Sequence, residues 1–312
     1  MSKILAVFGA TGNQGGSLVT YVLNDPELSK EYSVRAITRD VNSEKSKQLK
    51  ESGAEVVHGD ITDTASLKTA LAGVHTVFIM TAPVFGPDAL QIESGHAKAA
   101  ADVAVEQGVQ YIIFSTLPHV KEISGGKYTK VSPFDAKAEA EAYIRTLPVK
   151  SAFYSPGSFM ENSHTPGFLL HRTAPDGTEI VSRHHAPTSK LPLIAAVADT
   201  GKFVGAILAE PDKYEGKTFC AATALYTWED VAAVVSKVTG VKTVYQQVSV
   251  EEYMASLPPF VADVFFEAFS YWDEFGYYGP ETEEVVKWAA EHARGKLTTL
   301  EEYFEANPQP LA

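Results

Sequence analysis

The sequence predicts an α/β protein whose main element is an open, doubly wound parallel β-sheet. Six short runs rich in β-branched and aromatic residues recur along the first half of the chain, at residues 3–8, 33–38, 54–59, 75–80, 109–115 and 149–154. Both faces of these runs are apolar, as expected for strands that helices cover on both sides. Helical segments separate them, for example 43–53 and 89–108, and both of these end in glycine. This alternation implies right-handed crossovers between parallel strands.

Length and charge limit the class of protein. With 312 residues the chain can form about two domains of ~150 residues each. Its 26 Lys and Arg against 39 Asp and Glu give a formal charge of −13, which argues against direct binding to a phosphate backbone. The single cysteine, Cys220, excludes an intrachain disulfide and fits a reducing compartment. The sequence has no leader pattern and no apolar run of ~20 residues, so we expect a soluble intracellular protein without a membrane partner.

A glycine-rich turn follows the first predicted strand. In VFGATGNQGGSL, residues 7–18, three glycines are spaced three apart before a helix-forming stretch. Such a turn lets a pyrophosphate approach the free N–H groups and the positive dipole end of the helix. The strand before it and the helix after it favour a dinucleotide site, with a plain tight turn as the alternative. The expected cofactor contacts are Gly9, Thr11, Gly12, Asn13, Gln14 and Gly15.

The end of the second predicted strand distinguishes the two nicotinamide dinucleotides. Ligands of such sheets bind beyond the carboxyl ends of the strands, where a carboxylate would favour NAD. Here Thr38 is followed by Arg39. An arginine can bind a 2′-phosphate in a forked geometry, which favours NADP. The alternative is a solvated Arg39 paired with Asp40.

Two further strand ends supply candidate contacts by their position. Asp60 and Ile61 follow the third strand, where the edge and face of the adenine would lie. Thr81, Ala82 and Pro83 follow the fourth strand and would form a backbone-lined slot beside the pyrophosphate and the nicotinamide ribose.

Together these motifs resemble the NmrA-like family, named for a fungal regulator of nitrogen metabolite repression, within the atypical short-chain dehydrogenase/reductases. The resembling stretches lie in order within the first 162 residues: VFGATGNQGGSL, VRAITRD, GAEVVHGDITD, VFIMTAP, YIIFSTL, SPFDAKAEAEAYIR and YSPGSFMEN. The second half matches more loosely. The resemblance implies a Rossmann domain at 1–157 and a smaller α+β domain at 158–312, with parts of about 189–222 returning to the Rossmann sheet.

The resemblance also implies how the cofactor lies. NADP(H), or more weakly NAD(H), would follow the glycine loop, with Arg39 near the 2′-phosphate. Lys137 would reach the nicotinamide ribose as the one candidate catalytic residue. The nicotinamide end would be flanked by Tyr154, Pro156, Phe159 and Asn162.

Lys137 lacks the tyrosine that catalytic members of this superfamily carry four residues earlier, on the same helix face. Pro133 occupies that position. The segment is typical of a helix start, with Ser132 as N-cap, Pro133 in the first position and Asp135 in the third. Lys137 would then project toward the cofactor, with a plain surface lysine as the alternative.

Other groups could supply a proton in place of the tyrosine. The candidates are Tyr128, His119, Ser115 and Thr116, each with a structural role as the alternative. Isoflavone-reductase-like relatives also work without that tyrosine, so its absence does not exclude hydride transfer.

The second half contains no recognisable metal motif. None of its histidines, His164, His171, His184 and His185, has a partner at the helical spacing of a zinc site. An aromatic stretch at 258–279 is more informative, because its rings recur at near-helical intervals. This stretch is either a core helix or a wall of the cleft, or else a docking face for a basic partner; its members are Phe265, Phe266, Phe269, Trp272 and Phe275.

The sequence leaves two functions open. The first is an NADP(H)-binding regulator or redox sensor that acts through a protein partner, such as a transcription factor. The second is an NADP(H)-dependent oxidoreductase that reduces a small carbonyl, imine or quinone. The expected location is the cytoplasm, with the nucleus as an alternative, and the protein is expected to be a monomer or a homodimer.

Overall fold

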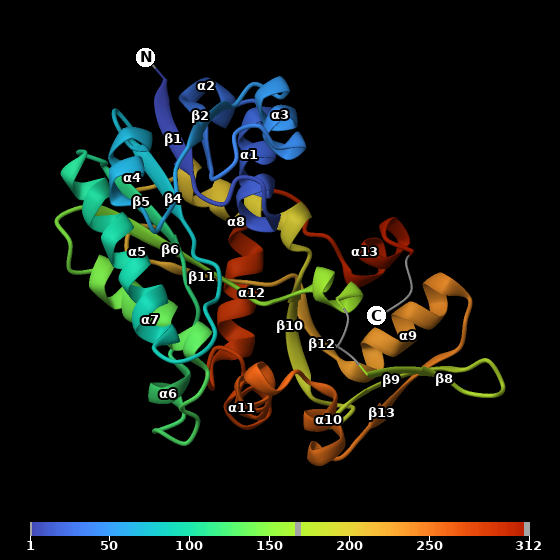
Figure 1. The fold of residues 1–312 in the computed structure, drawn as a ribbon. Helices are drawn as coiled ribbons and strands as arrows, with labels where there is room; N and C mark the ends of the chain where they lie inside the picture. Colours follow the sequence, from blue (N-terminus) through green and yellow to red (C-terminus); the bar gives the residue numbers. More distant parts are fainter. Residues whose placement is uncertain (1, 166–169, 309–312) are drawn as a thin grey trace.

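The central element of the structure is a seven-stranded parallel β-sheet (Figure 1). The computed structural model describes residues 2–165 and 170–308. The strands of this sheet are β1 (Lys3–Val7), β2 (Tyr32–Thr38), β3 (Glu55–His58), β4 (Thr76–Ile79), β5 (Tyr111–Ser115), β6 (Lys150–Pro156) and β11 (Thr218–Ala221). Their order is β3-β2-β1-β4-β5-β6-β11, with every pair parallel. All six predicted runs are strands, and the doubly wound α/β fold is confirmed.

Helices cover both faces of the sheet and bury an apolar layer on each (Figure 1). One face packs against α1 (Asn13–Asn24), α8 (Ala196–Ala209) and α12 (Thr282–His292). The other packs against α4 (Thr64–Ala70), α5 (Ala89–Glu106) and α7 (Ser132–Ile144). Two short helices, α2 (Leu28–Glu31) and α3 (Glu44–Glu51), flank β2 in the chain. The helices predicted at 43–53 and 89–108 are α3 and α5.

The topology predicts a ligand-binding crevice outside the carboxyl ends of β1 and β4. β1 lies between β2 and β4, so the chain reverses its direction of winding at this point of the sheet. Crossovers that leave in opposite directions open a crevice there, which is where doubly wound folds bind their ligands. The glycine-rich turn after β1 and the loop after β4 both emerge at this edge.

Glycines allow α8 to approach α1 closely. A Cβ atom on Gly201 would lie 2.3 Å from Cβ of Tyr21. A Cβ atom on Gly205 would lie 2.5 Å from the Tyr21 ring. The N–H of Gly201 also donates a hydrogen bond to Ser17 Oγ at 3.0 Å. The helix that begins at the glycine turn is therefore fixed against α8.

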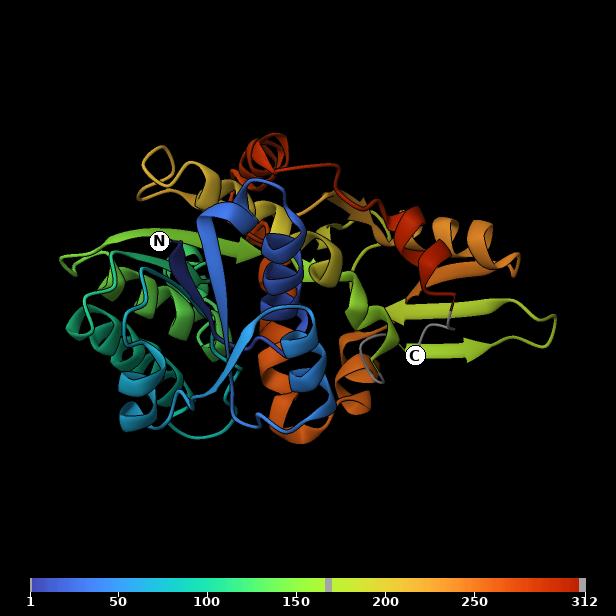
Figure 2. The same cartoon turned by 90° about the horizontal axis from the view of Figure 1, so that it is seen from above.

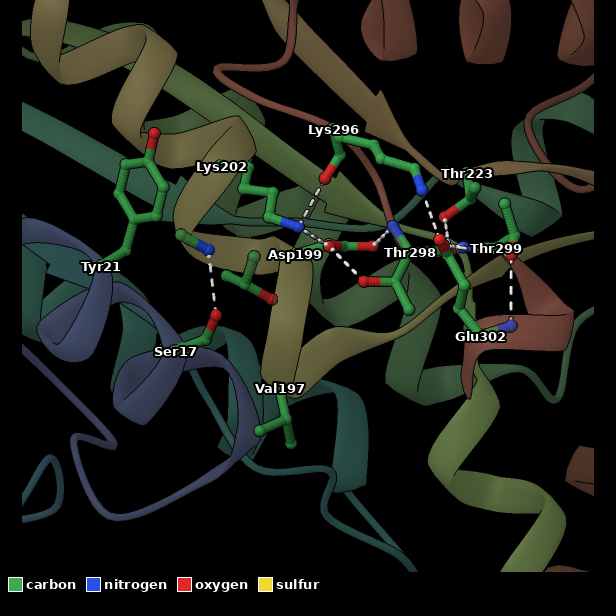
Figure 3. Close-up of polar contacts among 12 residues, drawn as sticks. Ser17, Tyr21, Val197, Asp199, Lys202, Thr223, Lys296, Thr298, Thr299 and Glu302 are labelled. Atoms are coloured by element: carbon green, nitrogen blue, oxygen red, sulfur yellow. Dashed lines mark hydrogen bonds and ion pairs between the residues drawn. The ribbon is translucent and has the colours of Figure 1, made fainter. Parts of the chain in front are cut away.

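A buried carboxylate attaches the segment after α12 to the same pair of helices (Figure 3). Asp199 of α8 accepts hydrogen bonds from the Thr298 N–H at 2.9 Å and from its hydroxyl at 3.0 Å. Lys202 Nζ donates to the same carboxylate at 2.7 Å. The Tyr21 hydroxyl of α1 donates to the Arg294 carbonyl at 2.7 Å. The C-terminal segment thus contacts both α1 and α8.

The remaining elements of the second half form two small sheets and several helices. One sheet contains β7 (Ser158–Phe159), β10 (Lys190–Ile194) and β12 (Ala224–Thr227); the other contains β8 (Leu170–Thr173), β9 (Glu179–Arg183) and β13 (Thr243–Gln247). The β8–β9 arm extends away from the large sheet (Figure 2). The other helices are α6 (Val120–Ile123), η1 (Met160–His164), α9 (Trp228–Thr239), α10 (Val250–Ser256), α11 (Pro259–Phe275) and α13 (Leu300–Ala306). The domain boundary at 157/158 stays a prediction.

α11 contains the predicted aromatic stripe. Phe269 in its middle is 2% exposed and packs edge-on against Trp272, with ring centroids 4.5 Å apart, so this part of α11 is a core helix. Phe260 at its beginning is 70% exposed and faces Phe85 of the loop after β4, with ring centroids 6.3 Å apart. In the described part of the chain, no helix is both long and apolar enough to cross a bilayer.

Candidate functional site

The glycines of the turn after β1 have different structural roles. Gly9 has a φ of +61°, which favours glycine. A Cβ atom on Gly15 would lie 2.4 Å from the Gly9 carbonyl oxygen, so only glycine lets α1 begin this close to the turn. The N–H of Gly12 donates to the Gly9 carbonyl at 2.8 Å and closes the turn. Gly12 itself is exposed at the start of α1.

The amino end of α1 is suited to hold an anion. No side chain caps it, and its first turn contains no acidic residue. Asn13 is exposed and Thr11 is half-buried. Gln14 is held to the end of β5 by the Ser115 hydroxyl, which donates to its side-chain oxygen at 2.7 Å. Free N–H groups and the positive end of the dipole therefore face the crevice.

Two cations follow β2, the strand that pairs with β1. Arg39 at the tip of β2 is exposed, and within the described residues its guanidinium has no ion pair, so a pairing with Asp40 is not observed. Lys45 of α3 reaches the glycine turn, because its Nζ donates to the Thr11 carbonyl at 3.2 Å. Sequence reasoning missed Lys45, since its place depends on how α3 packs.

After β3, the Asp60 side chain makes hydrogen bonds within its own turn. The Asp60 carboxylate accepts the N–H and the hydroxyl of Thr62, both at 2.9 Å. These hydrogen bonds lower the pKa of Asp60, and the charge of Arg39 lowers it further. Ile61 is half-buried against the apolar layer under α4. Both residues lie at the carboxyl edge of the sheet, and the expected adenine contact there stays a prediction.

Lys137 belongs to a buried polar cluster. Its side chain is 7% exposed, which excludes a plain surface lysine, and its Nζ donates to the Glu93 carboxylate. Glu93 on α5 is 1% exposed and also accepts the Thr81 hydroxyl at 2.7 Å and the Val84 N–H at 3.2 Å. Burial lowers the pKa of Lys137, while Glu93 opposes that shift. One carboxylate therefore connects α7 to the loop after β4, in which Ala82 and Pro83 are exposed.

Glu93 was missed by sequence reasoning, although the sequence contains a signal for it. On α5 it precedes Ala97, Ala100 and Ala104 at helical spacing, and all three alanines are buried. A carboxylate on the apolar face of a helix requires a buried partner.

The start of α7 corrects the predicted helix cap. The helix begins at Ser132 with Val131 as N-cap and without a capping side chain, so Pro133 and Asp135 lie one position later than expected. The Asp135 carboxylate does not cap α7. It accepts the Lys121 N–H of α6 at 3.2 Å and lies 3.1 Å from His119 Nδ1. Asp135 is 1% exposed, and burial raises its pKa.

The candidate proton donors other than His119 already have partners. The Tyr128 hydroxyl donates to Glu274 of α11 at 2.9 Å, and Ser115 donates to Gln14. The Thr116 hydroxyl donates to the Leu117 and Lys137 carbonyls, both at 3.4 Å. None of these three hydroxyls is therefore free to replace the missing tyrosine beside Lys137.

The candidate residues from the end of β6 to η1 divide into a core group and an edge group. Tyr154 is fully buried, and its hydroxyl lies 2.8 Å from Thr200 Oγ1 of α8, so its side chain packs the core instead of contacting a cofactor. Pro156 is buried, and its carbonyl accepts the Tyr277 hydroxyl at 3.2 Å. Phe159 and Asn162 are half-buried in β7 and η1 at the carboxyl edge of the sheet.

The described residues contain no group of three or more His, Cys, Asp or Glu that could hold a metal ion. His184 and His185 are stacked on each other with ring centroids 4.3 Å apart. Burial lowers their pKa values to about 4 and about 3, respectively. They are therefore neutral side chains that pack against α11 in the second half of the chain.

Comparison with known proteins assigns the family. The model of the NmrA-like family matches residues 1–304. The chain belongs to the NmrA-like family. It is 30% identical over 264 residues to the NmrA-like family domain-containing oxidoreductase FrzB of a Cladobotryum species, covering 80% of this chain and 77% of that protein.

Two solved structures have a fold similar to that of this protein over nearly the whole chain. The negative transcriptional regulator NmrA in complex with NAD superimposes with a TM-score of 0.80 at 23% identity, covering 99% of this chain and 98% of that one. The Citrobacter triphenylmethane reductase complexed with NADP(H) has a TM-score of 0.76 at 21% identity, covering 98% of both chains. At these identities the likeness supports the fold.

Proposed function

We propose that this NmrA-like protein binds NADP(H), and NAD(H) more weakly, in the crevice beyond β1 and β4. The pyrophosphate would lie against the uncapped amino end of α1. Arg39 and Lys45 would bind the adenosine 2′-phosphate, because Arg39 lies at the tip of β2 and Lys45 reaches the glycine turn. The complexes of NmrA with NAD and of the triphenylmethane reductase with NADP(H) support the same assignment.

In this proposal the protein is a nucleotide-dependent regulator that acts through a protein partner. The observation that supports it most is the state of Lys137: its ammonium faces Glu93 in a buried cluster, and Pro133 stands where a catalytic tyrosine would be. When bound, the nucleotide would supply the redox signal. The only cysteine would not, because burial and the charge of Glu141 raise the pKa of the Cys220 thiol to about 12.

The contacts of α1 provide a route from the nucleotide to the second half of the chain. α1 begins at the pyrophosphate site and meets α8 through Ser17 and Tyr21. α8 in turn binds the C-terminal segment through Asp199 (Figure 3). A shift of α1 on nucleotide binding would therefore reach a surface in the second half. With a formal charge of −13, that surface would suit a basic partner, for example a regulatory protein.

Hydrogen exchange tests the regulatory proposal. A ligand changes a conformational equilibrium only by its difference in affinity for the two states. We expect NADPH and NADP⁺ to protect the amides of α8 and of residues 293–299 to different degrees. Equal protection by both forms, together with equal affinities, would contradict a redox-sensing role.

A second function, NADP(H)-dependent reduction of a small carbonyl, imine or quinone, is favoured by a separate observation. Phe85 and Phe260 come from opposite halves of the chain and pack edge to face, although both rings are exposed. Such a pair could stack on a flat acceptor and exclude water from it. FrzB, a relative, is named an oxidoreductase. NADPH consumption across a panel of these acceptors, with Lys137→Met as the control variant, tests this function.

A further inference from the structure

An open cavity lies outside the proposed nucleotide site. It has a volume of about 410 Å³ and is lined by α7, by the carboxyl ends of β5 and β6 with the loop after β5, and by β11. Leu117, Pro118, Ala138 and Ala142 supply its apolar lining. Neither Lys137 nor any residue of the glycine turn belongs to its lining. A ligand of this cavity would therefore be distinct from the dinucleotide.

A buried hydroxyl in this cavity lacks a partner. Ser155 of β6 lines the cavity and is 2% exposed. Its Oγ makes no hydrogen bond within the described residues. Its neighbours leave it unused, because the Tyr278 hydroxyl donates to the Ser155 carbonyl at 2.8 Å and not to the side chain. A buried hydroxyl without a partner costs free energy that a bound polar group would recover.

His119 lies between two carboxylates beside the cavity. Its Nδ1 lies 3.1 Å from the buried Asp135 carboxylate, and its Nε2 lies 3.5 Å from the Glu122 carboxylate. His119 and Glu122 both line the cavity.

The charges around the cavity favour a cation. Among the described residues, Arg145 is the only Lys or Arg in its lining, and its guanidinium donates to Glu141 at 2.6 and 2.9 Å and to the Gly216 carbonyl at 2.9 Å. Glu122 and Glu139 remain, with side chains 76% and 39% exposed. Glu139 lies 3.8 Å from Lys98 Nζ. The cavity thus presents acceptors and net negative charge around an apolar lining.

We propose that this cavity binds an alkylammonium group, the charged end of either a small aliphatic amine or a lysine side chain of a partner protein. The N–H donors of the ammonium match Ser155 Oγ and the carboxylates at the rim. The aliphatic chain matches the apolar lining. A single anion does not fit, because the described lining offers it no free cation.

Calorimetric titration of the full-length protein tests the proposal with cadaverine (1,5-diaminopentane) as the probe and 1,5-pentanediol as its neutral counterpart. We expect saturable binding of cadaverine and none of the diol. Ser155→Ala should weaken cadaverine binding about tenfold or more, because a hydrogen bond to a charged group is lost. Glu139→Gln should weaken it about two- to fivefold, as for an exposed charge pair.

Matched variants separate this site from general attraction to an acidic protein. Ser151→Ala changes the same strand outside the cavity, and Glu106→Gln removes an exposed carboxylate of α5 that pairs with Lys68; both should bind cadaverine as the wild type does. NADPH affinity, measured in parallel, should be unchanged in Ser155→Ala.

A last arm identifies the source of the amine. Nα-acetyl-lysine amide is compared with cadaverine: tighter binding of the lysine derivative supports a partner side chain, and tighter binding of cadaverine supports a free amine. The proposal is overturned if neither probe binds, if the diol binds equally well, or if Ser155→Ala binds cadaverine as tightly as the wild type. An equal loss in Glu106→Gln and Glu139→Gln would also overturn it.

Discussion

The two ends of the proposed nucleotide site are built in different ways. At the pyrophosphate end, backbone groups of one short turn form the site, and Gly9, Gly12 and Gly15 supply its geometry within seven residues. At the nicotinamide end, Thr81, Glu93 and Lys137 come from three elements and meet only in the folded protein. The first end depends on backbone conformation, and the second depends on buried charge.

Because of this difference, substitutions at the two ends should have different consequences. Changes at the glycine turn should affect nucleotide affinity first, since the backbone of the turn is what would contact the pyrophosphate. Changes in the Glu93–Lys137 pair should affect stability first, because each ion is buried and has few other partners. The variants below sharpen or break this distinction.

The largest expected effect is on the buried pair. Glu93→Gln should lower the free energy of unfolding by about 3 kcal/mol, because it leaves the Lys137 ammonium buried without its counter-ion. Glu93→Leu combined with Lys137→Met should recover most of that loss, because an apolar pair has no charge to desolvate. Urea denaturation of the variants measures both effects. If the double variant were less stable than Glu93→Gln, the unpaired Lys137 ammonium would not be the cause of the lost stability.

The glycine turn should give the next largest effect. Gly15→Ala should cost about 1–3 kcal/mol of stability, since its Cβ would lie 2.4 Å from a carbonyl oxygen. It should also abolish NADPH binding by displacing the start of α1. Gly95→Ala on α5 is the matched control, because a Cβ there meets nothing within 4 Å; it should stabilise the protein by about 0.5–1 kcal/mol. Undiminished NADPH binding by Gly15→Ala would contradict the proposed pyrophosphate site.

The two cations after β2 should affect the choice of nucleotide without affecting stability. Arg39→Ala should weaken NADPH binding about tenfold or more and leave NADH binding nearly unchanged, because only NADPH has the 2′-phosphate. Lys45→Ala should act in the same direction with a smaller effect. Lys47→Ala is the control, because Lys47 lies two residues further along α3 and its Nζ is 3.5 Å from Glu44. Parallel titrations with both nucleotides measure this, and equal losses for the two would remove Arg39 from the 2′-phosphate site.

The smallest effect is expected at the aromatic pair. Phe260→Ala should leave the free energy of unfolding within about 0.5 kcal/mol of the wild type, since the ring is 70% exposed. If the protein reduces flat acceptors, this variant should raise their KM about two- to tenfold, which is the scale of one aromatic contact. Val241→Ala, also at an exposed apolar side chain, should change neither quantity. An unchanged KM would remove Phe260 from the acceptor site.

The large sheet could be predicted because its signals are local. Each of the six runs is apolar on both faces and is bounded by turn residues, so its neighbours in the chain are enough to identify a strand. The glycine turn is local for the same reason. The orientation of strand side chains could not be predicted in this way. Tyr154 and Ser155 point to opposite faces of a strand buried on both sides, so the pattern does not tell which one faces the cofactor.

The contacts that the sequence did not reveal all join distant segments. The sequence suggests that Asp135 caps its own helix, yet its carboxylate accepts the Lys121 N–H of α6, which packs against α7. Lys45 reaches the glycine turn only through the packing of α3. Glu93 also contacts distant segments, but its burial could have been predicted. A carboxylate at helical spacing from the alanines of α5 indicates a buried position.

The central claim is that a dinucleotide lies against the amino end of α1, and titration of NADPH followed by backbone amide NMR tests it most directly. The account predicts saturable shifts at the amides of Asn13, Gln14 and Gly15, with smaller shifts at Arg39 and Lys45. The absence of shifts at these amides, with NADPH at millimolar concentration, would contradict it.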